Sequence, residues 1–505
     1  MTHLLKTLET GQPVSKSAWK EASATLRQQL LDAQHRLLQS GRSSLLILVH
    51  GVDGAGRGET VNLFNEWMDP RHIRTEAFGL LSAIERQRPP MWRYWQVLPP
   101  KGHIGVLYGS WYSDPIASQM TDTDAPEGLS HRLAYIRRFE QMLVSEGVVL
   151  LKFWFHLSKK AARERMKLLA SDPRTAWRVT EQERERLQHH EAFVQAAEDV
   201  MAATHTDAAP WHLIDGADPA FRSLAASRHV LAALEHMLAM PPRMAAQPES
   251  LVESGASVSQ TQPNRLFWSD ANRTLKRKTY DEELERLQGR LALLSRDPRM
   301  QQRSLVLVFE GMDAAGKGST IRRLTHAWDA RFYRVVPVAA PNENERAQPY
   351  LWRFWRYIPP HGKAVIFDRS WYGRVLVERV EGYCSPVDWQ RAYDEINAYE
   401  EELSQSGAVI VKFWLAISPE EQLKRFKARE VTPHKNYKIT EDDWRNREKW
   451  PLYERAVEQM VDRTSTRMAP WHIVASDDKL WSRIEVLRLL CERLEGALDE
   501  VPAKN

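Results

Sequence analysis

The feature that most constrains this chain is an internal repeat. When the 505-residue sequence is shifted by 260 positions, LLILVHGVDGAGRGET (45–60) aligns with LVLVFEGMDAAGKGST (305–320), and the register then continues without a gap. A period of this length is too long for a solenoid, so we expect a duplicated domain of about 230 residues whose copies each fold as a unit. Further blocks match in the same register: 91–102 with 351–362, 109–112 with 369–372, 151–158 with 411–418, and 209–212 with 469–472.

The segment between the copies has the composition of a linker. Residues 241–264 are rich in proline, serine, glutamine and glycine, which do not favour a packed core. The sequence therefore predicts an N-terminal domain at 1–240, a linker at 241–264 and a C-terminal domain at 265–505.

Apolar runs alternate with helical patterns in both copies. A leading helix is expected at 17–39 in the first copy and at 278–295 in the second. Continuous apolar strands separated by helices predict an α/β fold, a parallel sheet flanked by helices in each copy. The remaining elements expected in the second copy are strands at 334–340, 364–370, 408–418 and 471–476, and helices at 387–406, 419–430 and 440–464.

The second copy carries a glycine-rich turn directly after its first apolar run. A buried strand followed by glycines and a lysine predicts a loop whose backbone N–H groups, helix dipole and ammonium group converge on phosphate. One glycine stands between the lysine and the hydroxyl pair, so Ser319 rather than Gly318 is the expected Mg²⁺ ligand. Asp313 inside the loop is explained either by turn formation or by a role in holding Mg²⁺ or orienting the accepting phosphate. The predicted phosphate-binding residues are Gly311, Gly316, Lys317, Gly318, Ser319 and Thr320.

Charged residues outside the loop fit phosphoryl transfer. Asp368 ends the apolar strand AVIF, where a carboxylate can hold Mg²⁺, and Arg369 and Arg374 follow it. The basic segment 429–438, with Lys435 and Lys438, resembles a lid that closes over phosphates, although an ordinary solvated loop has the same composition. Arg353, in a segment rich in tryptophan and arginine, could add a cation to a phosphate groove.

Composition excludes several classes of protein. No apolar run reaches the roughly 18 residues needed to span a membrane, and the first residues do not resemble a signal peptide. The two cysteines, Cys384 and Cys491, have neither metal-binding nor disulfide spacing. The formal net charge of +4 gives no argument for nucleic acid binding. We therefore expect a cytoplasmic protein.

Several ordered motifs in the second copy together resemble the polyphosphate kinase 2 family. They are GMDAAGKGST (311–320), DRSWYGR (368–374), VKFW (411–414), PHKNYK (433–438) and APW (469–471). The resemblance implies a fold like that of the phosphate-loop nucleotide kinases, Mg²⁺ as cofactor, and transfer of a terminal phosphoryl group between inorganic polyphosphate and a nucleotide. It also implies that tandem members phosphorylate AMP to ADP. Residue by residue, it assigns phosphate and Mg²⁺ roles to Asp313, Lys317, Asp368, Arg369 and Arg374, and lid roles to Lys435 and Lys438.

The first copy departs from these motifs where chemistry would occur. It keeps Asp53 opposite Asp313, but losing the carboxylate at the end of the strand removes a metal ligand, and exchanging an arginine for an aspartate adds repulsion beside a polyanion. We expect the first copy to be inactive and to serve a structural or polyanion-docking role. The replacements in the first copy are Arg57 for Lys317, Tyr108 for Asp368, Gly109 for Arg369, Asp114 for Arg374 and Thr175 for Lys435.

Three alternatives to a polyphosphate:AMP phosphotransferase stay open at the level of sequence. The chain could be a polyphosphate-dependent kinase of nucleoside diphosphates, an ATP-dependent nucleoside monophosphate kinase, or a binding protein without activity. The expected partners are inorganic polyphosphate and a nucleotide such as AMP, with no nucleic acid and no membrane, and a homo-oligomer is compatible with the sequence.

Overall fold

A computed structural model describes residues 5–9, 13–121, 126–241, 273–432 and 441–500. These residues divide into two compact units, each built around one copy of the repeat. Two short segments at equivalent positions of the repeat, 81–92 and 341–352, are grouped with the unit of the other copy. The predicted linker 241–264 and the lid residues Lys435 and Lys438 lie outside the described residues, apart from position 241.

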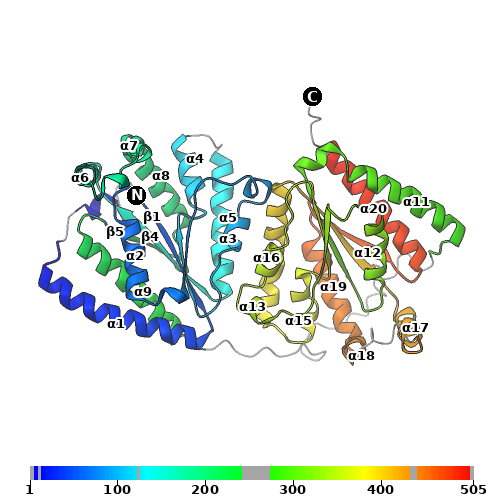
Figure 1. Cartoon of the computed structure of the whole chain (residues 1–505). Helices are drawn as coiled ribbons and strands as arrows, with labels where there is room; N and C mark the ends of the chain where they lie inside the picture. Colours follow the sequence, from blue (N-terminus) through cyan, green and yellow to red (C-terminus); the bar gives the residue numbers. More distant parts are fainter. Residues whose placement is uncertain (1–4, 10–12, 122–125, 242–272, 433–440, 501–505) are drawn as a thin grey trace. The chain divides into compact units, whose positions relative to one another are not determined.

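The first copy contains a five-stranded, fully parallel sheet in the order β2-β3-β1-β4-β5. Helices cover both of its faces, with α1, α2 and α9 on one side and α5 and α8 on the other (Figure 1). The strands are β1 (Ser44–Gly51), β2 (Ile73–Ala77), β3 (Ile104–Tyr108), β4 (Val148–His156) and β5 (Trp211–Asp215). The helices are α1 (Lys16–Ser40), α2 (Arg57–Trp67), α3 (Trp92–Trp95), α4 (Ser113–Thr121), α5 (Pro126–Ser145), α6 (Lys159–Ser171), α7 (Glu181–Gln188), α8 (His190–Thr204) and α9 (Pro219–Ala239).

The second copy repeats this architecture with the sheet order β10-β9-β6-β8-β7. Helices α11, α12 and α20 pack on one face, and α16 and α19 on the other (Figure 1). The strands are β6 (Ser304–Gly311), β7 (Tyr333–Pro337), β8 (Ala364–Asp368), β9 (Ala408–Ala416) and β10 (Trp471–Ala475). The helices are α11 (Arg277–Leu294), α12 (Lys317–His326), α13 (Glu343–Arg346), α14 (Trp352–Trp355), α15 (Val377–Val380), α16 (Pro386–Gln405), α17 (Pro419–Glu430), α18 (Glu441–Glu448), α19 (Trp450–Thr464) and α20 (Lys479–Asp499).

The predicted α/β fold is confirmed, but the longer helices of the second copy differ from the prediction in two places, and the one-turn helices α13, α14 and α15 were not predicted. The single helix expected at 440–464 is two, because the chain leaves helical geometry at Lys449 and Pro451 then occupies the first turn of α19, where its missing N–H does no harm. Helix α20 was not predicted. It begins at the cap Asp478, whose carboxylate accepts hydrogen bonds from the backbone N–H groups of Leu480 and Trp481.

The central strands form the core, and their register places the site. Residues 305–309 of β6 are fully buried, as expected for the middle strand of a covered parallel sheet. Phe309 pairs with Asp368 on β8, and Gly311 pairs with Leu415 on β9. Asp368 therefore ends its strand beside the start of the phosphate-binding loop, as parallel strands in register require.

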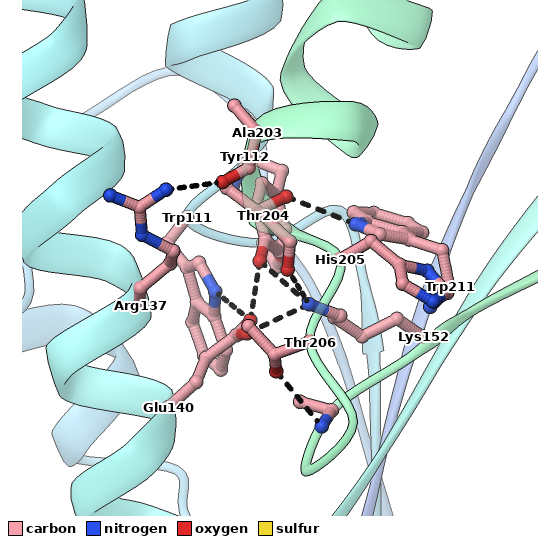
Figure 2. Close-up of polar contacts among 12 residues, drawn as sticks. Trp111, Tyr112, Arg137, Glu140, Lys152, Ala203, Thr204, His205, Thr206 and Trp211 are labelled. Atoms are coloured by element: carbon pink, nitrogen blue, oxygen red, sulfur yellow. Dashed lines mark hydrogen bonds and ion pairs between the residues drawn. The ribbon is translucent and has the colours of Figure 1, made fainter.

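A buried ionic network occupies equivalent positions in the two copies. In the first copy the Lys152 ammonium donates to Glu140 (2.8 Å), to the Tyr112 hydroxyl (3.1 Å) and to the Thr204 carbonyl (2.9 Å), as Figure 2 shows. The Trp111 indole and the Tyr112 hydroxyl donate to the same carboxylate. Because both copies keep the network although their loops differ, it serves the fold rather than the chemistry. The second copy builds it from Lys412, Glu400, Tyr372, Trp371 and Thr464.

Candidate active site

The phosphate-binding loop of the second copy joins β6 to α12. Gly311 has φ 147°, and a Cβ atom there would stand 2.6 Å from the carbonyl oxygen of Leu415, so only glycine lets β9 approach. Gly316 caps α12 with φ 114°, a left-handed conformation that glycine adopts without strain. No acidic residue stands in the first turn of α12, so its positive dipole end stays available to an anion.

Lys317 is held against the loop that it follows. Its ammonium donates to the carbonyls of Gly311 (2.7 Å) and Met312 (3.4 Å). Burial lowers the pKa of Lys317 and the charge of Arg369 lowers it further, while the carboxylates of Asp313 and Asp368 oppose the shift. The ammonium group is thus fixed over the loop where a phosphate would bind.

Asp313 connects the loop to two other parts of the second copy. Its Oδ1 accepts a hydrogen bond from Arg369 at 2.7 Å, and its Oδ2 accepts one from the side-chain amide of Asn446 on α18 at 3.0 Å. The Asn446 amide oxygen in turn accepts from the Tyr453 hydroxyl at 3.3 Å. Burial would raise the pKa of Asp313, but the positive charges of Lys317 and Arg369 outweigh it, so the pKa lies below its ordinary value. Asp313 is therefore an ionised, oriented carboxylate.

Asp368 differs from Asp313 because its carboxylate accepts no hydrogen bond from the described residues. An ideal Cβ placed on Gly318 would lie 3.8 Å from Asp368 Oδ2, so the carboxylate faces the first turn of α12. The hydroxyl of Ser319 in that turn accepts from Arg483 (3.3 Å) and donates to the carbonyl of Gly316 (2.9 Å). A carboxylate and a hydroxyl that face one cavity are the oxygen ligands that Mg²⁺ prefers.

A cavity of about 740 Å³ opens over the loop. Its lining brings together Asp313, Asp368, Arg369 and the residues from Gly316 to Ser319, as the sequence predicted. Basic side chains outnumber acidic ones, so the cavity attracts polyanions. The charged lining residues are Lys317, Arg322, Arg323, Arg369, Arg425, Arg429, Lys479 and Arg483, against Asp313, Asp368 and Asp443.

Sequence reasoning missed several of these cations. Arg322 and Arg323 lie on α12, whereas Lys479 and Arg483 come from α20, more than 150 residues further along the chain. The spacing of Lys479 and Arg483, four residues apart in a capped helix, was the available signal, but it requires the helix to be recognised first. Arg425 holds two loops of the backbone in place. Its guanidinium donates hydrogen bonds to the backbone carbonyls of Ala314, Ala315, Ser476 and Asp477.

Four predicted site residues in the described parts of the chain lie outside the cavity lining: Gly311, Thr320, Arg353 and Arg374. The Arg374 side chain donates to Glu378, four residues further on, at 2.7 Å. Arg353 donates to the backbone carbonyl of Ala339. Thr320 is 3% exposed, and its hydroxyl donates to the carbonyl of Gly316, so it stabilises the first turn of α12. Lys435 and Lys438, in the predicted lid, lie outside the described residues.

The equivalent loop of the first copy has a different pattern of charges. Arg57, in the place of Lys317, donates to Asp53 at 2.5 Å, and its guanidinium stacks over the ring of Tyr108. Arg186, in the place of Asn446, forms a second ion pair with Asp53 at 3.2 Å. The aspartate that both copies share is therefore neutralised within the first copy.

The chain is an α/β protein in which a glycine-rich loop follows the central strand of a parallel sheet and a carboxylate ends the adjacent strand. This arrangement is the one expected of a phosphate-loop kinase. The family model for polyphosphate kinase 2 matches residues 13–241 and 274–502. The chain belongs to the polyphosphate kinase 2 family and carries its domain twice.

Several similar proteins match this chain over nearly their full length. The chain is 48% identical to the polyphosphate:AMP phosphotransferase of Pseudomonas aeruginosa over 496 residues, which cover 98% of this chain and 99% of the relative. It is 46% identical to the protein of the same name from Pseudomonas syringae, over 98% of this chain and 99% of the relative. The crystal structure of a candidate polyphosphate kinase 2 from Pseudomonas aeruginosa matches with a TM-score of 0.86 at 46% identity, covering 98% of this chain and all of the other.

Proposed function

We propose that the second copy transfers the terminal phosphoryl group of inorganic polyphosphate to a nucleoside monophosphate, AMP, and forms ADP. The observation that carries this proposal is the cavity in which eight basic side chains surround the phosphate-binding loop and its two carboxylates. The similar full-length proteins from two Pseudomonas species are named polyphosphate:AMP phosphotransferases, which favours AMP as the acceptor.

Charge neutralisation is the main chemical task of such a site. A phosphate oxygen of AMP is already an anionic nucleophile, so in-line attack on the terminal phosphorus of polyphosphate needs no general base. The new P–O bond forms as the anhydride bond to the shortened polyphosphate breaks, and the leaving chain keeps the electron pair. Lys317, Arg369 and the N-terminus of α12 would hold the phosphoryl oxygens and reduce the repulsion between the two anions.

Mg²⁺ fits the donor set at this position. Asp368 and Ser319 offer a carboxylate and a hydroxyl to one cavity, and Mg²⁺ usually binds one or two carboxylates together with substrate phosphates and water. Both Asp313 oxygens already accept hydrogen bonds, so orientation of Arg369 is its principal role here and metal ligation its second. When bound, the ion would withdraw negative charge from the transferring group.

Cations outside the loop give a long polyanion a place to bind. Arg322, Arg323, Lys479 and Arg483 line the same cavity as Lys317, so successive phosphates of one chain could each meet a positive charge. An ATP donor has only three phosphates and would not require this extended lining. The cavity therefore supports polyphosphate over ATP as the donor.

The protein is also proposed to work in the cytoplasm. Cys384 and Cys491 are both buried free thiols, as expected in a reducing compartment. Among the described helices, none combines the length and apolar character needed to cross a bilayer.

A donor and acceptor assay tests the proposal. Purified full chain with Mg²⁺ and AMP should produce ADP from long-chain polyphosphate and little or none from ATP. Efficient transfer from ATP would instead identify a nucleoside monophosphate kinase, and faster conversion of ADP to ATP than of AMP to ADP would identify the diphosphate as the acceptor. Binding of polyphosphate without any transfer would leave only a binding protein.

A further inference from the structure

The helix of the first copy that corresponds to α12 carries an acidic residue in its first turn. Glu59 is the third residue of α2, at the position that Ser319 occupies in the second copy. The Glu59 side chain is 36% exposed. Its carboxylate receives hydrogen bonds from three arginines.

These contacts surround both carboxylate oxygens. Arg165 donates to Oε1 at 2.8 Å and Arg178 donates to the same oxygen at 3.4 Å, while Arg222 donates to Oε2 at 2.7 Å. The arginines come from three separate elements: α6, the short 3₁₀ helix Ala176–Arg178, and α9. Several arginines converging on oxygens at a helix N-terminus is the geometry by which proteins bind phosphate.

Arg222 fills the remaining space beside the loop. It is 2% exposed, and a Cβ atom on Gly56 would overlap its guanidinium group. Its Nε has no hydrogen-bond partner among the described residues, so one more donor is directed into this buried cluster. The second copy has Ser482 at the equivalent position, and a Cβ atom on Gly316 would have only the Ser319 hydroxyl within 4 Å, at 3.7 Å.

The arginine that binds Glu59 in the first copy has a different role at the equivalent position of the second copy. Arg425, the counterpart of Arg165, donates hydrogen bonds to the backbone carbonyls of Ala314 and Ser476 in the second copy, whereas Arg165 donates to Glu59 in the first. Asp53 is paired with Arg57 and Arg186, so the other anionic group at this loop also has its cations in place. The arginines around the loop of the first copy are therefore paired with carboxylates of the protein itself, namely Asp53 and Glu59.

We propose that Glu59 is a built-in carboxylate ligand that occupies the phosphate position of the first copy. The first copy therefore binds no polyphosphate at its loop, and all polyphosphate bound by the chain at such a loop is bound by the second copy. The arginine cluster of Arg165, Arg178 and Arg222 is an oxyanion site that takes a phosphate oxyanion once the glutamate is removed. The inference concerns binding in the first copy and does not require that the second copy transfers phosphate.

The test counts binding sites for tripolyphosphate in the full chain by calorimetry. Wild-type protein is expected to bind one tripolyphosphate per chain, and Glu59→Ser, which restores the residue of the second copy, is expected to bind two. Arg178→Ala keeps the glutamate and should still bind one. Adding Arg222→Ala to Glu59→Ser removes a required donor and should weaken the second site at least about 10-fold, because a charge-assisted hydrogen bond is lost.

Two results would overturn the inference. One is wild-type protein that already binds two tripolyphosphates per chain, and the other is a folded Glu59→Ser protein that still binds one. If Glu59→Ser does not fold, Glu59→Gln removes the charge while keeping the shape, and its second site should appear with lower affinity; a folded Glu59→Gln protein with one site would also count against the inference. Loss of AMP phosphorylation in the wild-type assay would argue against the proposed function but would not change these stoichiometries.

Discussion

Arg369 donates a 2.7 Å hydrogen bond to Asp313 from a backbone conformation that few arginines adopt, with φ at 64°. Ala314, the residue after Asp313, has the same φ, and these two are the only residues other than glycine with positive φ in the described parts of the chain. Their counterparts in the first copy are Gly54 and Gly109, with φ of 81° and 78°. The first copy therefore keeps the backbone geometry of the site with residues that adopt it freely, whereas the second copy accepts strain at the place where Arg369 is needed.

Because the backbone is strained at these two positions, replacing either residue by glycine should stabilise the protein, but only the replacement of Arg369 should remove activity. Ala314→Gly should raise the free energy of unfolding by about 0.5–1 kcal/mol, because relief of left-handed strain exceeds the added entropy of the unfolded chain. Arg369→Gly should relieve similar strain but abolish AMP phosphorylation, since the guanidinium group is lost. Denaturant unfolding combined with an ADP assay measures both effects. A destabilising Ala314→Gly would show that the backbone at this position is not strained.

Asp368→Asn tests the carboxylate that faces the first turn of α12. The amide keeps the shape of the side chain but cannot serve Mg²⁺ as an anionic ligand, so kcat should fall by about 100-fold or more while thermal stability changes little. Asp53→Asn in the first copy is the matched control and should leave kcat within about two-fold, because Asp53 is paired with Arg57 and Arg186 away from any proposed chemistry. Full activity in Asp368→Asn would remove the metal role of this residue.

Asn446 is expected to position Asp313 from α18. Asn446→Ala removes the amide that donates to Asp313 Oδ2 and should lower kcat by about 10-fold, as expected for a hydrogen bond to a charged group, with little change in KM for polyphosphate. Tyr453→Phe removes only the hydroxyl that donates to Asn446 and should have a smaller effect in the same direction. Steady-state kinetics with Arg186→Ala, the equivalent change in the first copy, supplies the control. An effect on KM alone would assign Asn446 to substrate binding instead.

The buried pair shown in Figure 2 should be costly to break. Glu140→Gln leaves the Lys152 ammonium buried without its carboxylate and should destabilise the first copy by about 3–5 kcal/mol in urea unfolding. Burial already lowers the pKa of Lys152, and Glu140 opposes that shift. Without Glu140, the lysine is therefore more readily deprotonated. Adding Lys152→Met to Glu140→Gln should recover part of the stability, because no uncompensated charge is left. If the single variant were as stable as wild type, the network would not contribute to the fold.

The buried His50 should make the stability of the first copy depend on pH. Burial lowers the pKa of His50 to about 3, and the charge of Arg57 acts in the same direction, so the folded protein keeps the ring neutral. The unfolded chain takes up a proton near pH 6.5, so it binds more protons than the folded one between about pH 6.5 and 3. Stability should therefore decrease as the pH falls through that range, by about 1.4 kcal/mol for each pH unit.

The control for this prediction replaces the histidine by a residue that does not titrate. His50→Gln should show a smaller slope of unfolding free energy against pH in urea titrations between pH 6 and 4, although its stability at pH 7 is lower. His212, whose pKa burial lowers to about 4, should contribute in the same direction and stays present in both proteins. Identical slopes for wild type and His50→Gln would contradict the assignment.

What the sequence determined by itself was mainly local. The repeat fixed two copies of one α/β domain, and alternating apolar runs and helices fixed a parallel sheet with a loop after its central strand, because burial of continuous apolar strands requires helices on both faces. Gly311, Gly316, Lys317 and Ser319 could be placed from one short segment, since the turn and the helix start are set by neighbours in the chain. Asp368 followed from strand order.

Only the tertiary structure decided which other charges reach the cavity. Lys479 and Arg483 enter it from α20 because that helix packs beside α12, a contact that no local pattern encodes. Arg374 was predicted in the site from its motif, but it is not among the residues that line the cavity, and its guanidinium donates to Glu378 four residues further on. In the first copy the sequence showed that Asp368 and Lys317 had been replaced, but the closing of the loop by Glu59 depends on arginines 106, 119 and 163 residues distant. Long-range packing brings such groups within hydrogen-bond distance, and local sequence patterns do not show which distant residues will meet.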